Sequence, residues 1–278
     1  MTAESPKWLV VYSLVAGALS AAVSAWGVGH NIYAASLVAG LFSGLAFLGL
    51  MAIRIERIAG HTRTAAFKSS ERAAVAQAMP LVYDKLDAPL PMSTLDEWTI
   101  ELAGLLQLQR LIERETPGVI VEIGSGASTP VLAHLAGDNG GFFFSIENDA
   151  SWVETTRGRL YGWDVDPDEV LHHVPLRDHS FKSSTPWYDT DWLDRIFGDR
   201  TIGLVFVDGP AARTGVHRRY PAFPYFAPKM ASGGIIMLDD YHRDDEQEIV
   251  ARWKEERPGI EVNTFTGHNK SMAIIRVP

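Results

Sequence analysis

The chain contains no cysteine among its 278 residues. Disulfides, thiolate catalysis and metal sites with cysteine ligands are therefore excluded, and the composition suits a reducing compartment. A net positive charge is found only in the first 80 residues, which hold six of the 25 Lys and Arg residues but only three of the 34 Asp and Glu residues. The remainder is strongly acidic. We therefore expect no nucleic-acid partner, since such a partner needs a basic surface.

Charge of either sign is absent from two long stretches near the N-terminus. Residues 8–29 and residues 32–53 are each 22 residues long and carry no charged side chain. At about 1.5 Å of rise per residue, a helix of this length would cross a hydrocarbon core of about 30 Å. We therefore expect a transmembrane helical hairpin over residues 1–54. A helical hairpin buried in the core of a soluble protein is the alternative.

Small and basic residues predict how this hairpin packs and which way it faces. Gly40 and Gly44 form a G-x-x-x-G face, which lets helices approach closely within the hairpin or between copies in a homo-oligomer. Five Lys and Arg residues and only two Glu residues lie within residues 54–72. The positive-inside rule then predicts a multi-pass inner-membrane protein with both termini and the downstream domain in the cytoplasm. Residues 55–92 are interpreted as a connector and residues 93–278 as that domain.

One segment organises the downstream part of the chain. Residues 119–129 read V-I-V-E-I-G-S-G-A-S-T, and their β-branched run is typical of a strand buried on both faces. The run ends at the turn Gly124-Ser125-Gly126, where the missing Cβ atoms of glycine let a ligand approach the backbone. A dinucleotide site would carry a third glycine where this sequence has Thr129. The segment predicts a strand, loop and helix that hold a nucleotide-like ligand.

Acidic residues follow further apolar runs. Glu147 ends the run at residues 142–147, where a carboxylate can accept hydrogen bonds from both ribose hydroxyls of an adenosyl ligand or of NAD; a solvated acid at a strand end is the alternative. Two later runs lead directly into Asp208 and into the pair Asp239 and Asp240. Ligands bind beyond the carboxyl ends of parallel strands, so we expect these acids to face one crevice of an α/β sheet.

Four motifs lie downstream of residue 120: E-x-G-x-G from Glu122, V-D-G-P around Asp208, R-x-x-x-x-R-R-Y-P-A and G-G-I-I-M-L-D-D-Y. Together they resemble the class I S-adenosylmethionine-dependent methyltransferases, and among them the methyltransferase-24-like subgroup. The resemblance begins near Leu95 and implies a Rossmann-like seven-stranded sheet with an antiparallel last strand. Residues 260–265 and 272–277 alternate as a terminal hairpin, which matches that strand and disfavours an NAD-dependent enzyme.

The resemblance also implies S-adenosylmethionine as cofactor. In the family, the glycine loop lies against the methionine and ribose of the cofactor, and an acid at the position of Glu122 supports the loop and the amino group. The loop at residues 175–190 meets the adenine or closes over the substrate, so Asp178 would accept from the adenine amino group; a plain surface acid is the alternative. The predicted cofactor-binding residues are Glu122, Gly124, Ser125, Gly126, Glu147, Asp178 and Asp208.

Methyl transfer needs an acceptor aligned with the sulfonium methyl group and, for a hydroxyl acceptor, removal of a proton. Asp208, Asp239 and Asp240 resemble the carboxylates that bind magnesium in metal-dependent O-methyltransferases. The lysine base of the catechol type, three residues after the first aspartate, is replaced here by Ala211. Mg²⁺ at the three aspartates is therefore one alternative. Without a metal, Asp208 or His242 is the candidate catalytic base.

The sequence leaves the acceptor open. Arg213, Arg218 and Arg219 lie between the acidic segments, where they either grip an anionic acceptor or neutralise the local acids. We favour a membrane-anchored methyltransferase that O-methylates a small or lipid-linked acceptor at the cytoplasmic face. The alternative is a non-catalytic membrane protein whose methyltransferase-like domain binds cofactor or a partner.

Overall fold

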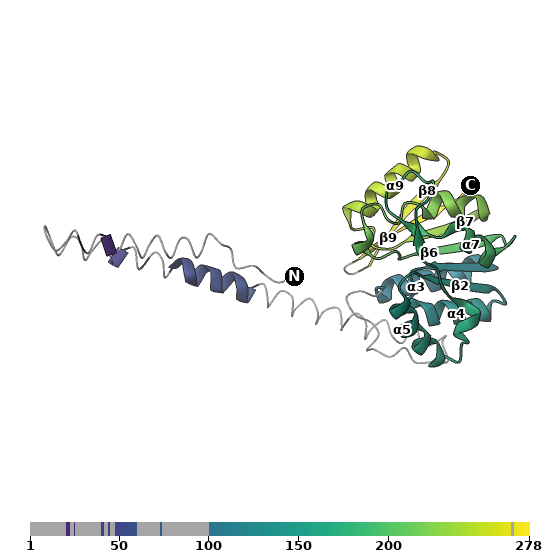
Figure 1. Ribbon diagram of the computed structural model, residues 1–278, viewed down its shortest axis with the longest axis horizontal. Helices are drawn as coiled ribbons and strands as arrows, with labels where there is room; N and C mark the ends of the chain where they lie inside the picture. The colour runs from purple at the N-terminus through teal and green to yellow at the C-terminus, as the bar shows by residue number, and fades with distance from the viewer. Residues whose placement is uncertain are drawn as a thin grey trace. The chain divides into compact units, whose positions relative to one another are not determined.

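The computed structural model describes residues 100–278, except 268 and 269, and residues 48–59. Seven single residues are described besides these, at positions 21, 22, 25, 40, 41, 44 and 73. The chain divides into two compact units, Met1–Arg72 and Ala73–Pro278. The described residues of the first unit are helical, and the second unit carries the β-sheet (Figure 1). The predicted domain boundaries at residues 54 and 92 stay predictions.

Residues 48–59 form a helix whose side chains are largely exposed. Among the residues that the structure describes, no helix is both long enough and apolar enough to cross a membrane. The prediction of a multi-pass membrane protein with a cytoplasmic domain and cytoplasmic termini is therefore wrong. The prediction is based only on the hydropathy of the two uncharged runs. The described helix extends beyond the second run and includes the charged residues Arg54, Glu56 and Arg57. Most of both runs, and most of the connector at residues 55–92, lie outside the described residues.

Gly40 and Gly44 are helical and exposed. A Cβ atom built on either glycine would meet no atom within 4 Å. No described residue of this chain therefore packs closely against that G-x-x-x-G face, and its use between copies stays a prediction.

A seven-stranded mixed sheet forms the centre of the second unit. Its order is β3-β2-β1-β6-β7-β9-β8; the first five strands are parallel, and β9 is antiparallel to both of its neighbours. This topology confirms the predicted Rossmann-like fold, including the terminal hairpin. The strands are β1 (Val119–Ile123), β2 (Phe142–Glu147), β3 (Leu171–His173), β6 (Ile202–Val207), β7 (Met230–Leu238), β8 (Glu261–Thr266) and β9 (Ser271–Arg276), and a separate small sheet pairs β4 (Leu176–Arg177) with β5 (Trp187–Tyr188).

Helices cover both faces of the large sheet (Figure 1). One face is covered by α3 (Leu102–Glu115) and α4 (Ser128–Asp138), and the other by α7 (Thr190–Phe197), α8 (Ala222–Phe226) and α9 (Asp244–Glu256). The helices α5 (Ala150–Tyr161) and α6 (Pro167–Val170) pack against β2 and β3. The described part of the second unit also contains the 3₁₀ turns η2 (Ala212–Thr214) and η3 (Ala227–Lys229).

The alternation of side chains along β1 explains the two hydrophobic cores. Val119, Val121 and Ile123 point into the core under α7, α8 and α9, whereas Ile120 points into the core under α3 and α4. All five residues of this strand are buried, and each apolar side chain contributes about 1.5–3 kcal/mol by leaving water. Glu122 shares the face of Ile120, so the strand carries its carboxyl group into the protein interior.

Four parallel strands end at one edge of the sheet. Ile123 of β1 pairs with Ile146 of β2 and with Val207 of β6, and Val207 pairs in turn with Leu238 of β7. The residues that follow these strand ends are therefore neighbours in space, although they are far apart in the sequence.

Candidate active site

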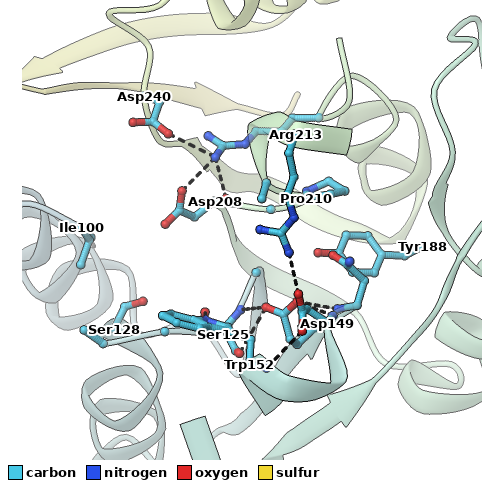
Figure 2. A pocket seen from close by; sticks show the side chains of 18 of the residues that line it. Ile100, Ser125, Ser128, Asp149, Trp152, Tyr188, Asp208, Pro210, Arg213 and Asp240 are labelled. Carbon is cyan, nitrogen blue, oxygen red and sulfur yellow. Dashed lines mark hydrogen bonds and ion pairs between the residues drawn. The ribbon is translucent and has the colours of Figure 1, made fainter. Parts of the chain in front are cut away.

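A cavity of about 490 Å³ lies at this edge of the sheet, within the usual size range of small-molecule sites. Figure 2 shows Ser125 and Trp152 on one side of it and Asp208 and Asp240 on another. Five of the predicted cofactor-binding residues line it: Gly124, Ser125, Gly126, Glu147 and Asp208. Its charged lining is balanced, with Glu147, Asp149, Asp208 and Asp240 against Arg213, Arg219, Arg243 and Lys270.

The glycine loop touches the loop that follows β6. Gly124 has a φ of +92°, and a Cβ atom there would lie 2.7 Å from the backbone nitrogen of Gly209. This position therefore requires glycine for the fold itself. A Cβ atom on Gly126 would meet nothing within 4 Å, while its N–H donates to the Thr129 hydroxyl at 2.7 Å. Gly126 therefore leaves the loop open toward a ligand.

Glu147 stands at the end of β2 with both carboxylate oxygens oriented by donors. The N–H groups of Asn148 and Asp149 donate to Oε1 at 2.7 and 2.8 Å. The N–H and hydroxyl groups of Ser125 donate to Oε2 at 3.1 and 3.3 Å. Burial raises the pKa of this carboxyl, and the hydrogen bonds oppose that shift. Glu147 thus fixes the glycine loop and presents an acceptor to the cavity.

Glu122 lies beside the loop without lining the cavity. Its carboxylate accepts hydrogen bonds from the hydroxyls of Ser128 and Thr129 in α4 and of Ser145 in β2, at 2.5, 2.6 and 2.6 Å. Thr129 accepts in turn from the Gly126 N–H. The structure therefore places Glu122 as a support of the loop through Thr129. Burial raises the pKa of Glu122 to about 7 in spite of these three donors.

The Glu122 carboxyl is expected to make the protein less stable as the pH rises. Between about pH 4.5 and 7 the folded chain keeps a proton that the unfolded chain has released, so the free energy of unfolding falls by about 3 kcal/mol across this window. Glu122→Gln should lose this contribution. Chemical denaturation of both proteins at pH 5 and pH 8 measures it, with Glu154→Gln on the exposed side of α5 as control. Parallel pH profiles for the protein and its Glu122→Gln variant would contradict the assignment.

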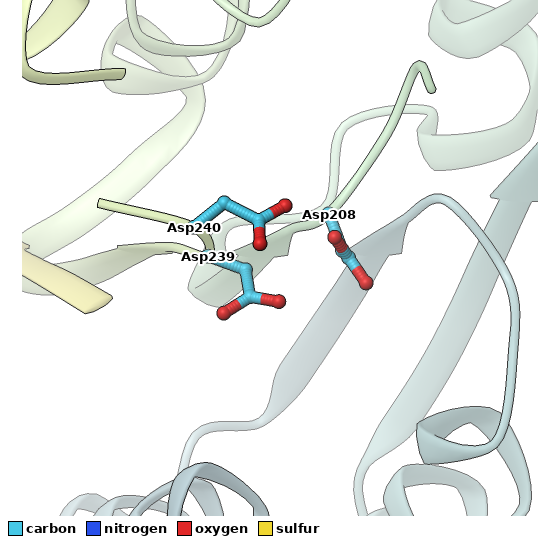
Figure 3. A group of neighbouring side chains, drawn as sticks. All are labelled: Asp208, Asp239 and Asp240. Carbon is cyan, nitrogen blue, oxygen red and sulfur yellow. The ribbon is translucent and has the colours of Figure 1, made fainter. Parts of the chain in front are cut away.

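Three aspartates from two strand ends form an acidic cluster (Figure 3). One carboxylate oxygen from each of Asp208, Asp239 and Asp240 lies within 4.8 Å of the others. Neither oxygen of Asp239 has a hydrogen-bond partner among the described residues. Burial, and then the neighbouring Asp239, raises the pKa of Asp208 well above its usual range. Burial and the charge of Asp240 raise the pKa of Asp239 to about 6.

Arg219 lies inside this cluster and is 2% exposed. Its Nη2 atom is 3.0 Å from Oδ1 of Asp208 and 3.2 Å from Oδ2 of Asp240. Its Nη1 atom donates to the backbone oxygen of Asp239 at 3.1 Å. One guanidinium group therefore joins the ends of β6 and β7 and neutralises part of their charge.

The donor set also fits a hard divalent cation. Asp240 Oδ1 and both oxygens of Asp239 have no hydrogen-bond partner in the described chain, and Arg219 bonds to only one carboxylate oxygen each of Asp208 and Asp240. Oxygen-only ligands are those that Mg²⁺ prefers.

The other two arginines of the sequence motif also pair with acids. Arg218 contacts Glu246 at 2.9 Å and donates to the backbone oxygen of Pro210 at 3.0 Å, so it holds the loop after β6 onto α9. Arg213 forms an ion pair with Asp149, which lies on the opposite side of the cavity (Figure 2). The distance between Nη2 of Arg213 and Oδ2 of Asp149 is 2.5 Å. In this structure the arginines neutralise acids.

Two predicted residues lie away from the cavity. Asp178 and His242 are both exposed, and neither lines the cavity. His242 lies four residues after the end of β7, and Asp178 follows β4 of the separate small sheet. In both cases the path of the chain after the strand carries the residue away from the cavity.

Trp152 belongs to the site and was not predicted from the sequence. Its indole N–H donates to the backbone oxygen of Ser125 at 2.6 Å, and the ring lines the cavity. The guanidinium carbon of Arg159 lies 5.1 Å from the ring centre. The only signal in the sequence is an aromatic residue near the start of the helix after Glu147. A tryptophan with no contact to a ligand would give the same pattern.

Residues 121–241 match the model of a family described as a methyltransferase domain. No curated protein matches the chain significantly. A protein from Klebsiella pneumoniae provisionally named an O-methyltransferase shares 15% identity and a TM-score of 0.53 over 75% of this chain and 96% of its own. The O-methyltransferase TomG from Streptomyces achromogenes, in complex with SAM, shares 17% identity and a TM-score of 0.50 over 73% of this chain and 89% of its own. At such low identity these structural similarities show the fold alone. Together with the family match over residues 121–241, they support a class I S-adenosylmethionine-dependent methyltransferase domain.

Proposed function

We propose that this chain is an S-adenosylmethionine-dependent O-methyltransferase for a small-molecule acceptor. The observation that carries the proposal is a single cavity in which the glycine loop and Glu147 meet Asp208 and Asp240. The glycine loop and Glu147 suit an adenosyl cofactor, and the carboxylates of Asp208 and Asp240 suit an acceptor hydroxyl that must lose its proton. The family match over residues 121–241 supports the same chemistry.

The glycine loop and Glu147 would hold the cofactor, which when bound supplies a methyl group on a sulfonium. The loop backbone would lie against its methionine and ribose, since Gly126 lines the cavity and a Cβ atom there would meet nothing within 4 Å. Glu147 would accept from the ribose hydroxyls, because its donors hold the carboxylate in place without covering it: it remains part of the cavity wall. Trp152 would keep the loop in its binding conformation through the bond to Ser125.

Asp208 is the proposed base. Its carboxylate lies at the cavity, and burial raises its pKa toward the range in which a carboxyl accepts a proton from a hydroxyl efficiently. Arg219, 3.0 Å from Asp208, would hold the carboxylate in one orientation. Asp208, Asp239 and Asp240 would hold Mg²⁺ if the enzyme uses it, and the ion would lower the pKa of the acceptor hydroxyl.

The cofactor assignment is tested by calorimetry on the full chain with S-adenosylmethionine and, separately, with NAD. We expect micromolar binding of the former only. Glu147→Gln should weaken it about 10-fold to 100-fold, because charge-assisted hydrogen bonds to the ribose are lost. Glu154→Gln, the same change at an exposed position of α5, should bind as the unaltered chain does.

Release of S-adenosylhomocysteine in the presence of hydroxyl and amine compounds, with and without Mg²⁺, then tests catalysis. Turnover with hydroxyl acceptors supports the proposal. Binding of NAD in place of S-adenosylmethionine would reject the cofactor, and turnover confined to amines would reject the acceptor class.

A further inference from the structure

Tyr188 ends the strand β5 and forms part of the cavity wall. The residue is 1% exposed, and its ring packs edge-on against Trp187 with 5.5 Å between ring centroids. The hydroxyl end reaches the strand ends at the cavity, since a Cβ atom built on Gly209 would come within 2.6 Å of the phenol oxygen. Figure 2 shows Tyr188 on the side of the cavity opposite Asp208.

The Tyr188 hydroxyl has no hydrogen-bond partner in the part of the chain that the structure describes. Two other tyrosines of the same domain, both with well-buried rings, have satisfied hydroxyls: Tyr225 donates to Asp194 at 2.8 Å, and Tyr220 donates to Glu256 at 2.6 Å. An unpaired buried hydroxyl costs stability. The fold therefore gains nothing from this hydroxyl, whereas phenylalanine would fill the same space.

The charged group with the largest effect on Tyr188 is Glu147, ahead of Arg219 and Asp208. Burial, foremost, raises the pKa of the phenol well above its usual range. The hydroxyl therefore keeps its proton at any working pH and remains a donor. Glu147 already accepts hydrogen bonds from Ser125, Asn148 and Asp149, and the Tyr188 hydroxyl is not among its donors. The Tyr188 hydroxyl therefore remains available to donate to a ligand that is bound by Glu147.

We propose that Tyr188 is a cofactor-binding residue whose hydroxyl donates a hydrogen bond to the ribose of S-adenosylmethionine. The inference rests on the proposed function and adds to the glycine loop and Glu147 a third contact from a separate small sheet. It explains why a hydroxyl that destabilises the ligand-free fold stands at this position.

Tyr188→Phe in the full chain tests the proposal by two readouts with opposite signs. The dissociation constant of S-adenosylhomocysteine should rise about fivefold to tenfold, because one neutral hydrogen bond is lost. The same factor is expected for 5′-methylthioadenosine, which keeps the ribose and lacks the amino-acid part. The Tm of the ligand-free protein should rise by about 2–4 °C, because an unpaired buried hydroxyl is removed.

Tyr225→Phe is the matched control, since its hydroxyl is paired with Asp194 and does not line the cavity. It should lower the Tm and leave both dissociation constants unchanged. The inference is overturned if Tyr188→Phe binds both ligands as the unaltered chain does, lowers the Tm, or weakens S-adenosylhomocysteine alone. If the unaltered chain binds neither ligand, the proposed function fails and the inference falls with it.

Discussion

Replacing Gly124 by alanine is expected to abolish cofactor binding and to lower the free energy of unfolding by about 3 kcal/mol. The φ of +92° is unfavourable for any residue with a Cβ atom. That atom would also lie 2.7 Å from the nitrogen and 2.8 Å from the Cα atom of Gly209. Gly209 cannot move away easily, because its N–H donates to the backbone oxygen of Ile123. Chemical denaturation and calorimetry with S-adenosylmethionine measure the two effects.

Gly126→Ala separates the requirements of the fold from those of the ligand. Its Cβ atom would meet nothing within 4 Å, so we expect stability within about 0.5 kcal/mol of the unaltered chain. Any loss of cofactor affinity in this variant then reports a close approach of the ligand to the loop. If Gly124→Ala were as stable as Gly126→Ala, this result would contradict the close contact between the loops that follow β1 and β6.

Removing the buried guanidinium by Arg219→Met should lower the free energy of unfolding by about 3–5 kcal/mol at pH 8, because Asp208 and Asp240 lose their shared partner. The loss should shrink on acidification. Without Arg219 the pKa values of Asp208 and Asp239 rise further, so the folded chain binds more protons than the unfolded chain, and stability falls as the pH rises. In the unaltered protein the pKa of Asp239 is already about 6. Denaturation at pH 5.5 and pH 8 in metal-free buffer measures the difference.

Arg213→Met is the control for this prediction. Its side chain is 69% exposed and pairs with Asp149 at the surface, so its removal should change stability by less than about 1 kcal/mol at either pH. A similar small and pH-independent effect for Arg219→Met would show that the acidic cluster does not depend on the guanidinium group.

Much of the second unit could be predicted from local patterns. The β-branched run at Val119–Ile123 and the alternating pattern of β8 and β9 identify strands because side-chain periodicity reports burial. Parallel strands expose their carboxyl ends at one edge, so the positions of Gly124, Glu147 and Asp208 at one cavity follow from order and topology alone.

The prediction of membrane spans shows the limit of the same reasoning. Hydropathy identified two uncharged runs, but no described helix is long and apolar enough to cross a membrane. The described helix at residues 48–59 carries charge from Arg54 onward. Hydropathy reports which side chains avoid water, and most of both runs lie outside the described residues.

The strand segments, the glycine loop and the acids at the strand ends could be identified from the sequence, because they depend on backbone sterics and on side-chain period. The paths of the loops over the sheet became visible only in the folded chain. Folding brought Trp152 and Tyr188 to the cavity, left Asp178 and His242 exposed, and placed Arg219 among the aspartates. Loop paths depend on packing between distant segments, and no local pattern encodes such contacts.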